Sequence, residues 1–184
     1  MDAVSAEALT EDYLDALEDL PARSVIAALR KWNRSQSSPE EVAAIRSKIE
    51  FLIGKKFRDR DGNERLLELA DVVAPYNLQV NALRAALPPE ARVGTVDKFQ
   101  GQEAPVCLVS MTSSSADEIP RGVDFLFSLN RINVAISRAQ ILSIVVASRD
   151  LLEVPCTNIE QVRQVNSLCA LKKYGDAIAG GKTQ

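Results

Sequence analysis

The chain has 184 residues and is 46% hydrophobic, which suits one folded domain with a real core and excludes a disordered chain. Its 22 basic and 25 acidic residues give a net charge of −3, so any contact with nucleic acid must use a local face of the molecule. Histidine is absent, which excludes Ser-His-Asp triads, Cys-His dyads and histidine metal sites.

The sequence shows neither a membrane span nor a secretory leader. Its apolar runs fall short of the roughly 20 residues that cross a bilayer, and no basic region precedes an apolar stretch at the N-terminus. We therefore expect a cytoplasmic protein without a membrane partner. Cys107, Cys156 and Cys169 lie far apart and lack the CxxC spacing of zinc or redox sites, which predicts reduced, mostly buried thiols and no metal site.

Residues 1–37 are expected to form an acidic helical extension and a linker. Residues 2–20 hold seven acids and no base, and their apolar residues recur at helical spacing: Leu9, Tyr13, Leu14 and Leu17. A second helix is predicted after Pro21, with Val25, Ile26 and Leu29 on one face. The polar residues 35–38 indicate a linker.

A strong helix start follows this linker. Ser38 can cap the helix, Pro39 suits its first position and Glu41 can close a capping box. We expect this helix to run to about Ile53 and to end at Gly54.

A locally basic segment comes next, with seven bases against four acids between residues 46 and 65. The pair Asp61-Gly62 predicts a hairpin turn within it. The segment either contacts phosphates or is simply an exposed charged hairpin, and its residues alone favour the exposed hairpin.

Strands and helices alternate from residue 70 onward, which predicts parallel βαβ units and therefore an open parallel sheet with helices on both faces. The strands are expected at residues 70–74, 92–96, 106–111 and 141–147. Helices are expected after a cap at Asn77, from about Ser128, and over about residues 158–173, and Ser148 should cap the segment after the last strand. Such sheets place binding sites at the carboxyl ends of their strands, where we expect the informative residues.

Three segments carry residues suited to chemistry. In the first, Tyr76 and Asn77 follow a strand end and Pro75, which predicts an exposed Tyr76 and a helix N-terminus that favours phosphate contacts. Many α/β proteins have such an edge, so this segment alone does not define a site.

The second segment follows the strand predicted at residues 92–96 and is dense in hydrogen-bonding groups: Thr95, Asp97, Lys98, Gln100 and Glu103. Gly101 would let the backbone approach a ligand closely, and Phe99 would pack inward and fix the loop. This density predicts a binding site rather than a purely structural loop.

In the third segment, Arg131 and Arg138 are seven residues apart and so share one face of a predicted helix. Two aligned arginines suit a polyanion or a transferring phosphoryl group. For this segment alone, a pair of solvated or salt-bridged arginines is the better explanation.

Together the three segments resemble motifs IV, V and VI of superfamily 1 helicases, most closely the 5′-to-3′ branch that includes RNA-decay and Okazaki-fragment helicases. The matching stretches read Pro75-Tyr76, VDKFQGQE at residues 96–103 and RINVAISRA at residues 131–139. The resemblance covers about residues 39–173 and extends to bacterial proteins that join a RecB-like nuclease to such a helicase. It implies a RecA-like domain over residues 38–175, followed by a flexible tail at residues 176–184.

The resemblance also implies roles for single residues. Arg138 would be the arginine finger that reaches the γ-phosphate of ATP, Gln100 and Gly101 would line the same phosphate, and Glu103 would accept a hydrogen bond from the ribose. Arg131, with Asn133, would support the helix that carries Arg138 and so belongs to the ATP-binding set. Four residues would face a single-stranded nucleic-acid track: Tyr76, Asn77, Thr95 and Lys98.

A phosphate loop and a pair of acids for Mg²⁺ are missing from the sequence. Gly180-Gly181-Lys182-Thr183 comes nearest, but Asp176 stands where the first glycine belongs. We therefore expect ATP and Mg²⁺ to bind only together with an N-terminal RecA-like domain, in the same or another chain, and the isolated chain to be inactive as an ATPase. Whether the chain is a fragment or free-standing stays open.

Two alternatives remain beside an ATP-dependent helicase. One is a non-catalytic nucleic-acid-binding or protein-interaction module derived from a helicase. The other is a structural α/β domain with decayed motifs, against which the intact Gln100, Glu103, Arg131 and Arg138 argue.

Overall fold

The computed structural model describes residues 24–30, 37–59, 61–99, 101–112, 134 and 136–179, with the backbone alone at residues 24–30 and 174–179. Four predicted features lie wholly or largely outside the described residues: the acidic helix at residues 2–20, the linker, the start of the helix near Ser128, and the glycine pair at residues 180–181. No helix within the described ranges is long and apolar enough to span a bilayer.

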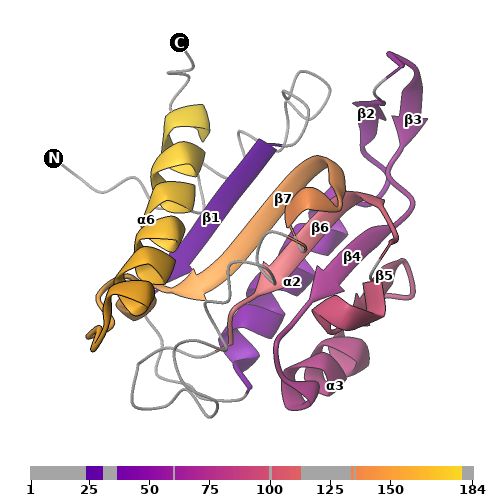
Figure 1. Cartoon of the computed structure of the whole chain (residues 1–184). Coiled ribbons are helices and arrows are strands. Elements are labelled where there is room, and N and C mark those ends of the chain that lie inside the picture. The colour runs from indigo at the N-terminus through magenta and orange to yellow at the C-terminus, as the bar shows by residue number, and fades with distance from the viewer. Residues whose placement is uncertain are drawn as a thin grey trace, which may run out of the picture.

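A five-stranded sheet forms the centre of the fold (Figure 1). Its strands are β1 (Ser24–Arg30), β4 (Ala70–Val73), β5 (Ala91–Gly94), β6 (Ala104–Ser110) and β7 (Ala139–Ser148). They lie in the order β1-β7-β6-β4-β5, and every neighbouring pair is parallel. The predicted open parallel α/β sheet is confirmed.

Helices cover both faces of this sheet, as predicted. Successive strand residues point to opposite faces, so Cys107 and Val109 of β6 belong to one buried cluster while Val106 and Leu108 belong to the other. The first cluster is closed by α6 (Ile159–Ala179) and by the short 3-10 helices η2 (Val96–Phe99) and η4 (Arg149–Leu152). The second is closed by α2 (Pro39–Leu52) and α3 (Asn77–Ala86).

The helix predicted after Pro21 is wrong, because Ser24–Arg30 forms the edge strand β1. A stretch of five apolar residues, Val25 to Leu29, is short enough to suit either a strand or part of a buried helix. Parallel pairing with β7, from Ser24 opposite Leu142 to Arg30 opposite Ser148, decides between the two. The sheet therefore includes residues that precede the boundary predicted at residue 37.

A charged hairpin extends from the sheet, as the Asp61-Gly62 pair predicts. Its strands β2 (Lys56–Arg58) and β3 (Glu64–Leu66) are antiparallel, and Gly62 has a φ of 83°, which glycine adopts without strain. An exposed ion pair joins Lys56 to Glu64 at 2.6 Å, and a second pair joins the exposed Arg65 to the half-buried Asp59 at 2.8 Å.

Of two helix caps predicted from neighbouring residues, one is correct and one is wrong. Ser148 caps η4 as expected, because its hydroxyl accepts the Asp150 N–H at 3.3 Å. The cap of α3 is Tyr76, which makes no side-chain capping bond, so the prediction that Asn77 is the cap is wrong by one residue.

The start of α2 is partly as predicted, since the Ser38 hydroxyl accepts the Glu41 N–H at 3.2 Å. The expected capping box is wrong, because the Ser38 N–H donates to Gln79 Oε1 at 2.8 Å instead. The Glu41 carboxylate turns into the core, where it accepts from the Ser110 hydroxyl at 2.5 Å and from the Thr112 N–H at 3.0 Å. Burial raises the pKa of Glu41 from its ordinary 4.5 to about 8, although these hydrogen bonds lower it.

Glu41→Gln should remove a pH dependence of stability. The folded-state pKa of Glu41, about 8, lies above its ordinary value of 4.5. Protonated Glu41 therefore makes its full contribution to the free energy of unfolding below about pH 4.5, and this contribution is lost as the pH rises through about 8. Thermal unfolding at about pH 5 and pH 9 should therefore show a larger fall in Tm for the natural chain than for the variant. An equal fall in both proteins would contradict the assignment.

Candidate functional site

The parallel pairing of β6 with β7 brings two distant predicted segments together. The Ala104 N–H donates to the Arg138 carbonyl at 3.2 Å, and Ala104 lies opposite Ala139 in the sheet. The Gln140 side-chain amide donates to Glu103 Oε2 at 3.2 Å. Glu103 and Arg138 therefore lie at the same edge of the sheet, where β6 and β7 begin. We call Gly101, Glu103, Arg138 and Gln140 the amino-edge cluster.

The expectation that all site residues gather at the carboxyl ends of the strands is wrong. Residues 95–103 leave the carboxyl end of β5 and reach the amino end of β6, and these two strands flank β4. The segment thus passes from one edge of the sheet to the other. Only its first residues stay at the carboxyl edge, with the residues that follow β4; we call Tyr76, Asn77, Thr95 and Lys98 the carboxyl-edge cluster. Gln100 and Arg131 lie outside the described residues.

Arg138 is almost completely buried, with 8% of its surface exposed. One guanidinium nitrogen, Nη1, donates to the Gln102 carbonyl at 3.3 Å, while Nε is buried and has no partner within the described ranges. A buried donor that lacks an acceptor is costly and uncommon in folded proteins. Among the described residues, Nε of Arg138 is thus a buried donor whose hydrogen bond is unsatisfied.

A part-buried ion pair, which the sequence motifs did not predict, braces the same loop. Arg92 of β5 donates to both carboxylate oxygens of Asp71 of β4, at 2.7 and 3.0 Å, and Asp71 is fully buried. The same guanidinium lies 3.5 Å from the Glu103 carbonyl and 5.9 Å from the centre of the Phe99 ring. The sequence did carry a signal for this pair, since Asp71 and Arg92 lie in two successive predicted strands. Charged residues are rarely buried unless they are paired, so two opposite charges in buried strands predict an ion pair.

Cys107 lies on the sheet face that carries these charges. The pKa of its thiol is raised to about 12, chiefly by burial and also by the negative charge of Asp71, while the positive charge of Arg138 acts to lower it. A thiol with so high a pKa is a poor nucleophile at neutral pH. Cys107, Cys156 and Cys169 are free thiols, the first buried and the others half-buried.

The aromatic residues of the two loops are buried together. The prediction that Phe99 packs inward is confirmed, since 2% of its surface is exposed. The prediction that Tyr76 is exposed is wrong, because it is 6% exposed and belongs to the same cluster as Phe99 and Val73. Asn77, in the next position, is exposed at the start of α3.

Lys98 folds back over the end of β5. Its ammonium donates to the Val93 carbonyl at 3.3 Å, and its N–H donates to the Thr95 carbonyl at 3.0 Å. Gly94 permits this fold, because a Cβ there would lie 2.6 Å from Lys98 Cδ. A cationic group is thus held at the carboxyl edge beside Thr95, which is half-buried.

Known proteins share this region. A family model described as an AAA domain matches residues 21–150. "DNA-binding protein SMUBP-2" of Mus musculus is 36% identical over 112 residues, which are 59% of this chain and 10% of that protein. "DNA replication ATP-dependent helicase/nuclease JHS1" of Arabidopsis thaliana is 30% identical over 121 residues, which are 65% of this chain and 8% of that protein.

A longer match extends over nearly the whole chain. "Uncharacterized ATP-dependent helicase MJ0104" of Methanocaldococcus jannaschii is 25% identical over 175 residues, which are 91% of this chain and 24% of that protein. The parallel sheet, its loops and these relatives define a RecA-like domain of the helicase type. The chain belongs to the AAA domain family, whose model begins before β1 and ends within η4. It spans about a tenth of the length of SMUBP-2.

Arg92→Ala should destabilise the fold by about 3 kcal/mol, because it leaves the buried Asp71 carboxylate without its partner. Arg46→Ala is the matched control, since Arg46 makes an ion pair of the same 2.7 Å length with Glu50 at a surface where both side chains are more than half exposed. The control should change the free energy of unfolding by less than about 1 kcal/mol. Urea denaturation measures both, and similar losses would show that Arg92 does not brace the core.

Proposed function

We propose that this chain is the second motor domain of an ATP-dependent helicase. In this role it supplies an arginine finger to an ATP site shared with an N-terminal RecA-like domain, and it supplies part of a track for single-stranded nucleic acid. The observation that carries the proposal is the buried Arg138, whose Nε lacks a described partner, beside Glu103 at the amino edge.

Arg138 would act on charge that develops during hydrolysis. Water attacks the γ-phosphorus of ATP, the bond to the β–γ bridging oxygen breaks, and ADP and phosphate leave. A guanidinium in a site shielded from water stabilises the negative charge spread over the phosphoryl oxygens. Gln100 and Gly101 would line the same phosphate, and Arg131 would support the segment that carries Arg138.

Glu103 would hold the sugar of the nucleotide. Its carboxylate accepts hydrogen bonds only, and the Gln140 amide already binds Oε2 at 3.2 Å, which leaves lone pairs for a ribose hydroxyl. Among the described residues no group of three His, Cys, Asp or Glu side chains could hold a metal ion. The domain that carries the phosphate loop would therefore hold Mg²⁺.

Nucleic acid would bind at the opposite edge of the sheet. Asn77 is exposed at the N-terminus of α3, where backbone N–H groups favour a phosphate, and Lys98 adds a positive charge beside Thr95. Tyr76 would support this nucleic-acid edge indirectly, because its ring is buried in the cluster that also contains Phe99. Residues 95–103 join this edge to the ATP edge, so a shift of Glu103 or Gly101 on hydrolysis can move Lys98 and Thr95.

Arg138→Ala should lower the nucleic-acid-stimulated ATPase rate by about 10³-fold in the motor assembled from this chain and a phosphate-loop domain. Arg163→Ala, an exposed arginine on α6 that pairs loosely with Glu160 at 3.8 Å, should leave the rate within twofold. A steady-state phosphate-release assay measures both. An unchanged rate in Arg138→Ala would refute the arginine-finger role.

Lys98→Ala should weaken binding of a single-stranded oligonucleotide and make it less sensitive to salt. Loss of one phosphate contact reduces the slope of log K against log salt by about 0.7 for single strands. Fluorescence anisotropy over a range of salt concentrations gives this slope. Lys173→Ala, an exposed lysine on α6, is the control. Equal slopes for the natural chain and Lys98→Ala would remove Lys98 from the track.

A further inference from the structure

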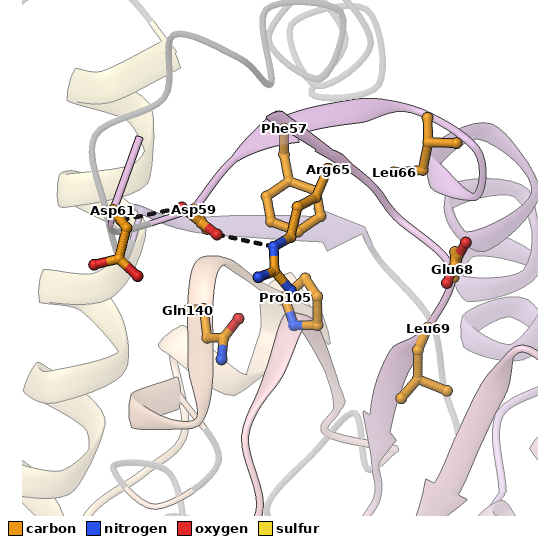
Figure 2. Close-up of a pocket in the computed structure, with 9 residues that line it drawn as sticks. All are labelled: Phe57, Asp59, Asp61, Arg65, Leu66, Glu68, Leu69, Pro105 and Gln140. Carbon is orange, nitrogen blue, oxygen red and sulfur yellow. Dashed lines mark hydrogen bonds and ion pairs between the residues drawn. The ribbon is translucent and has the colours of Figure 1, made fainter. Parts of the chain in front are cut away.

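Polar side chains are packed in opposite ways at the two edges of the sheet. At the amino edge, a cavity of about 690 Å³ lies between the β2–β3 hairpin and Gln140 of β7, and the Asp61 and Arg65 side chains in its wall are exposed (Figure 2). At the carboxyl edge, five hydrogen-bonded polar residues are 1% exposed or less, and we call them the buried network: Ser38, Glu41, Gln79, Ser110 and Thr112. Buried polar groups that satisfy one another hold the elements that carry them in one arrangement.

Gln79 lies in the first turn of α3 and joins three elements through one side-chain amide. Its Oε1 accepts the Ser38 N–H at 2.8 Å, while its Nε2 donates to the Ser38 carbonyl at 3.3 Å and to the Ser110 hydroxyl at 3.0 Å. Both N–H groups of the amide are thus paired. This side chain ties the start of α3 to the start of α2 and to the end of β6.

Glu41 of α2 closes the network on the other side of the same hydroxyl. Ser110 donates to Glu41 Oε2 at 2.5 Å, and the Thr112 N–H donates to Oε1 at 3.1 Å and to Oε2 at 3.0 Å. Among the described residues, Thr112 is the one non-glycine residue with a positive φ, which is 70°. A β-branched residue keeps this conformation only where its surroundings impose it, and the Glu41 carboxylate supplies that constraint.

The buried network lies where binding sites form in open parallel sheets. From β4 the chain continues to β5 on one side, and from β6 it continues to β7 on the other, so the carboxyl ends of β4 and β6 form the switch point of the topology. Val73 and Val109, near those two ends, are paired in the sheet. α3 begins just after β4, and Tyr76 gives its first turn no side-chain capping bond. The network therefore holds a helix N-terminus at the switch point.

We propose that Gln79 and Glu41 are positioning residues for the proposed nucleic-acid edge: through the shared Ser110 hydroxyl they hold the first turn of α3 against β6, in the orientation that presents its N–H groups to a phosphate. The inference rests on the proposed function, which places a nucleic-acid phosphate at Asn77. Gln79 and Glu41 are buried and do not touch the phosphate, so both act through the placement of α3.

The charge of Glu41 makes this positioning depend on pH. The pKa of Glu41 is raised to about 8, chiefly by burial, while the hydrogen bonds from Ser110 and Thr112 lower it and the negative charge of Glu40 raises it. α3 and β6 bring neutral side chains to the network, those of Gln79 and Ser110. Ionised Glu41 adds a buried negative charge to the group that holds the start of α3. Binding of a phosphate there should therefore favour protonated Glu41, and binding should in turn take up protons.

A pH profile of Glu41→Gln, measured on the full chain, tests the inference. Fluorescence anisotropy gives the affinity for an oligodeoxyadenylate, whose bases do not titrate between about pH 6.5 and pH 9.5. The affinity of the natural chain should fall about fivefold more across this interval than that of the variant. The variant keeps every other titratable group, so the difference reports Glu41 alone. Equal profiles for the two proteins would overturn the inference.

Proton uptake provides an independent readout of the same coupling. Calorimetric titrations at about pH 8, in two buffers of different ionisation enthalpy, give the number of protons bound with the oligonucleotide. The natural chain should take up more protons than Glu41→Gln, because only the natural chain carries the titrating carboxyl. Equal uptake would also contradict the inference.

Gln79→Leu removes the amide and keeps a buried side chain of similar size. Affinity for the oligonucleotide should fall about tenfold with an unchanged salt slope, because no cationic contact is lost. Gln164→Leu is the matched control, since Gln164 is also buried but lies on α6, beside β1 and away from α3 (Figure 1). Equal affinities of the two variants would refute the role of Gln79. Should circular dichroism show that Gln79→Leu does not fold, the pH profile of Glu41→Gln decides alone.

The two proposals fail in different ways. If Lys98→Ala reduces the salt slope while Glu41→Gln and Gln79→Leu bind like the natural chain, the nucleic-acid edge stands and the positioning role is refuted. If the natural chain binds no single strand at any pH, both proposals fall.

Discussion

The hydrogen-bonded start of the β6–β7 pair is the constraint on which the rest of the candidate site depends. The Ala104 N–H to Arg138 carbonyl bond joins a loop after β5 to the residue that precedes β7. Nearly every residue of β6 and β7 is buried, and their two faces pack against different clusters. A slip of one residue would exchange those faces, so the core fixes where Arg138 emerges. The position of the proposed finger is thus set by hydrophobic packing.

This constraint also explains why polar residues lie at two edges. Residues 95–103 begin where β5 ends next to the end of β4 and finish beside Arg138, and Phe99 anchors the middle of the segment in the core. The part-buried Arg92–Asp71 pair holds the same segment from β4 and β5. This connection would give a physical route by which the proposed ATP edge and the proposed nucleic-acid edge are coupled.

Short-range patterns predicted much of the fold. The Ser38 cap, the Asp61-Gly62 turn and the alternation of strands and helices depend on neighbouring residues, so the sequence suffices for them. β1 escaped prediction because its partner β7 is more than 100 residues away. The role of Glu41 was predicted wrongly, because the sequence pattern of a capping box does not distinguish a capping carboxylate from one that turns into the core and accepts a hydrogen bond from Ser110.

The candidate site was harder to predict from sequence than the fold. The motifs singled out Glu103 and Arg138 as candidates, and the strand order, which only the sheet reveals, places them at the amino edge. Tyr76 looked exposed because the covering η2 follows it only after another helix and strand. The cavity under the hairpin has no motif at all, since Gln140 and Arg65 meet there only through tertiary structure.

Binding of a transition-state mimic tests the central claim most directly, because an arginine finger should favour the transition state over the ground state. The assembled motor, with and without Arg138→Ala, would be titrated with ADP–aluminium fluoride and with a non-hydrolysable ATP analogue. The account predicts that the variant loses about 10³-fold in affinity for the mimic and only a few-fold for the analogue. Equal losses for both ligands, or no loss for the mimic, would contradict it.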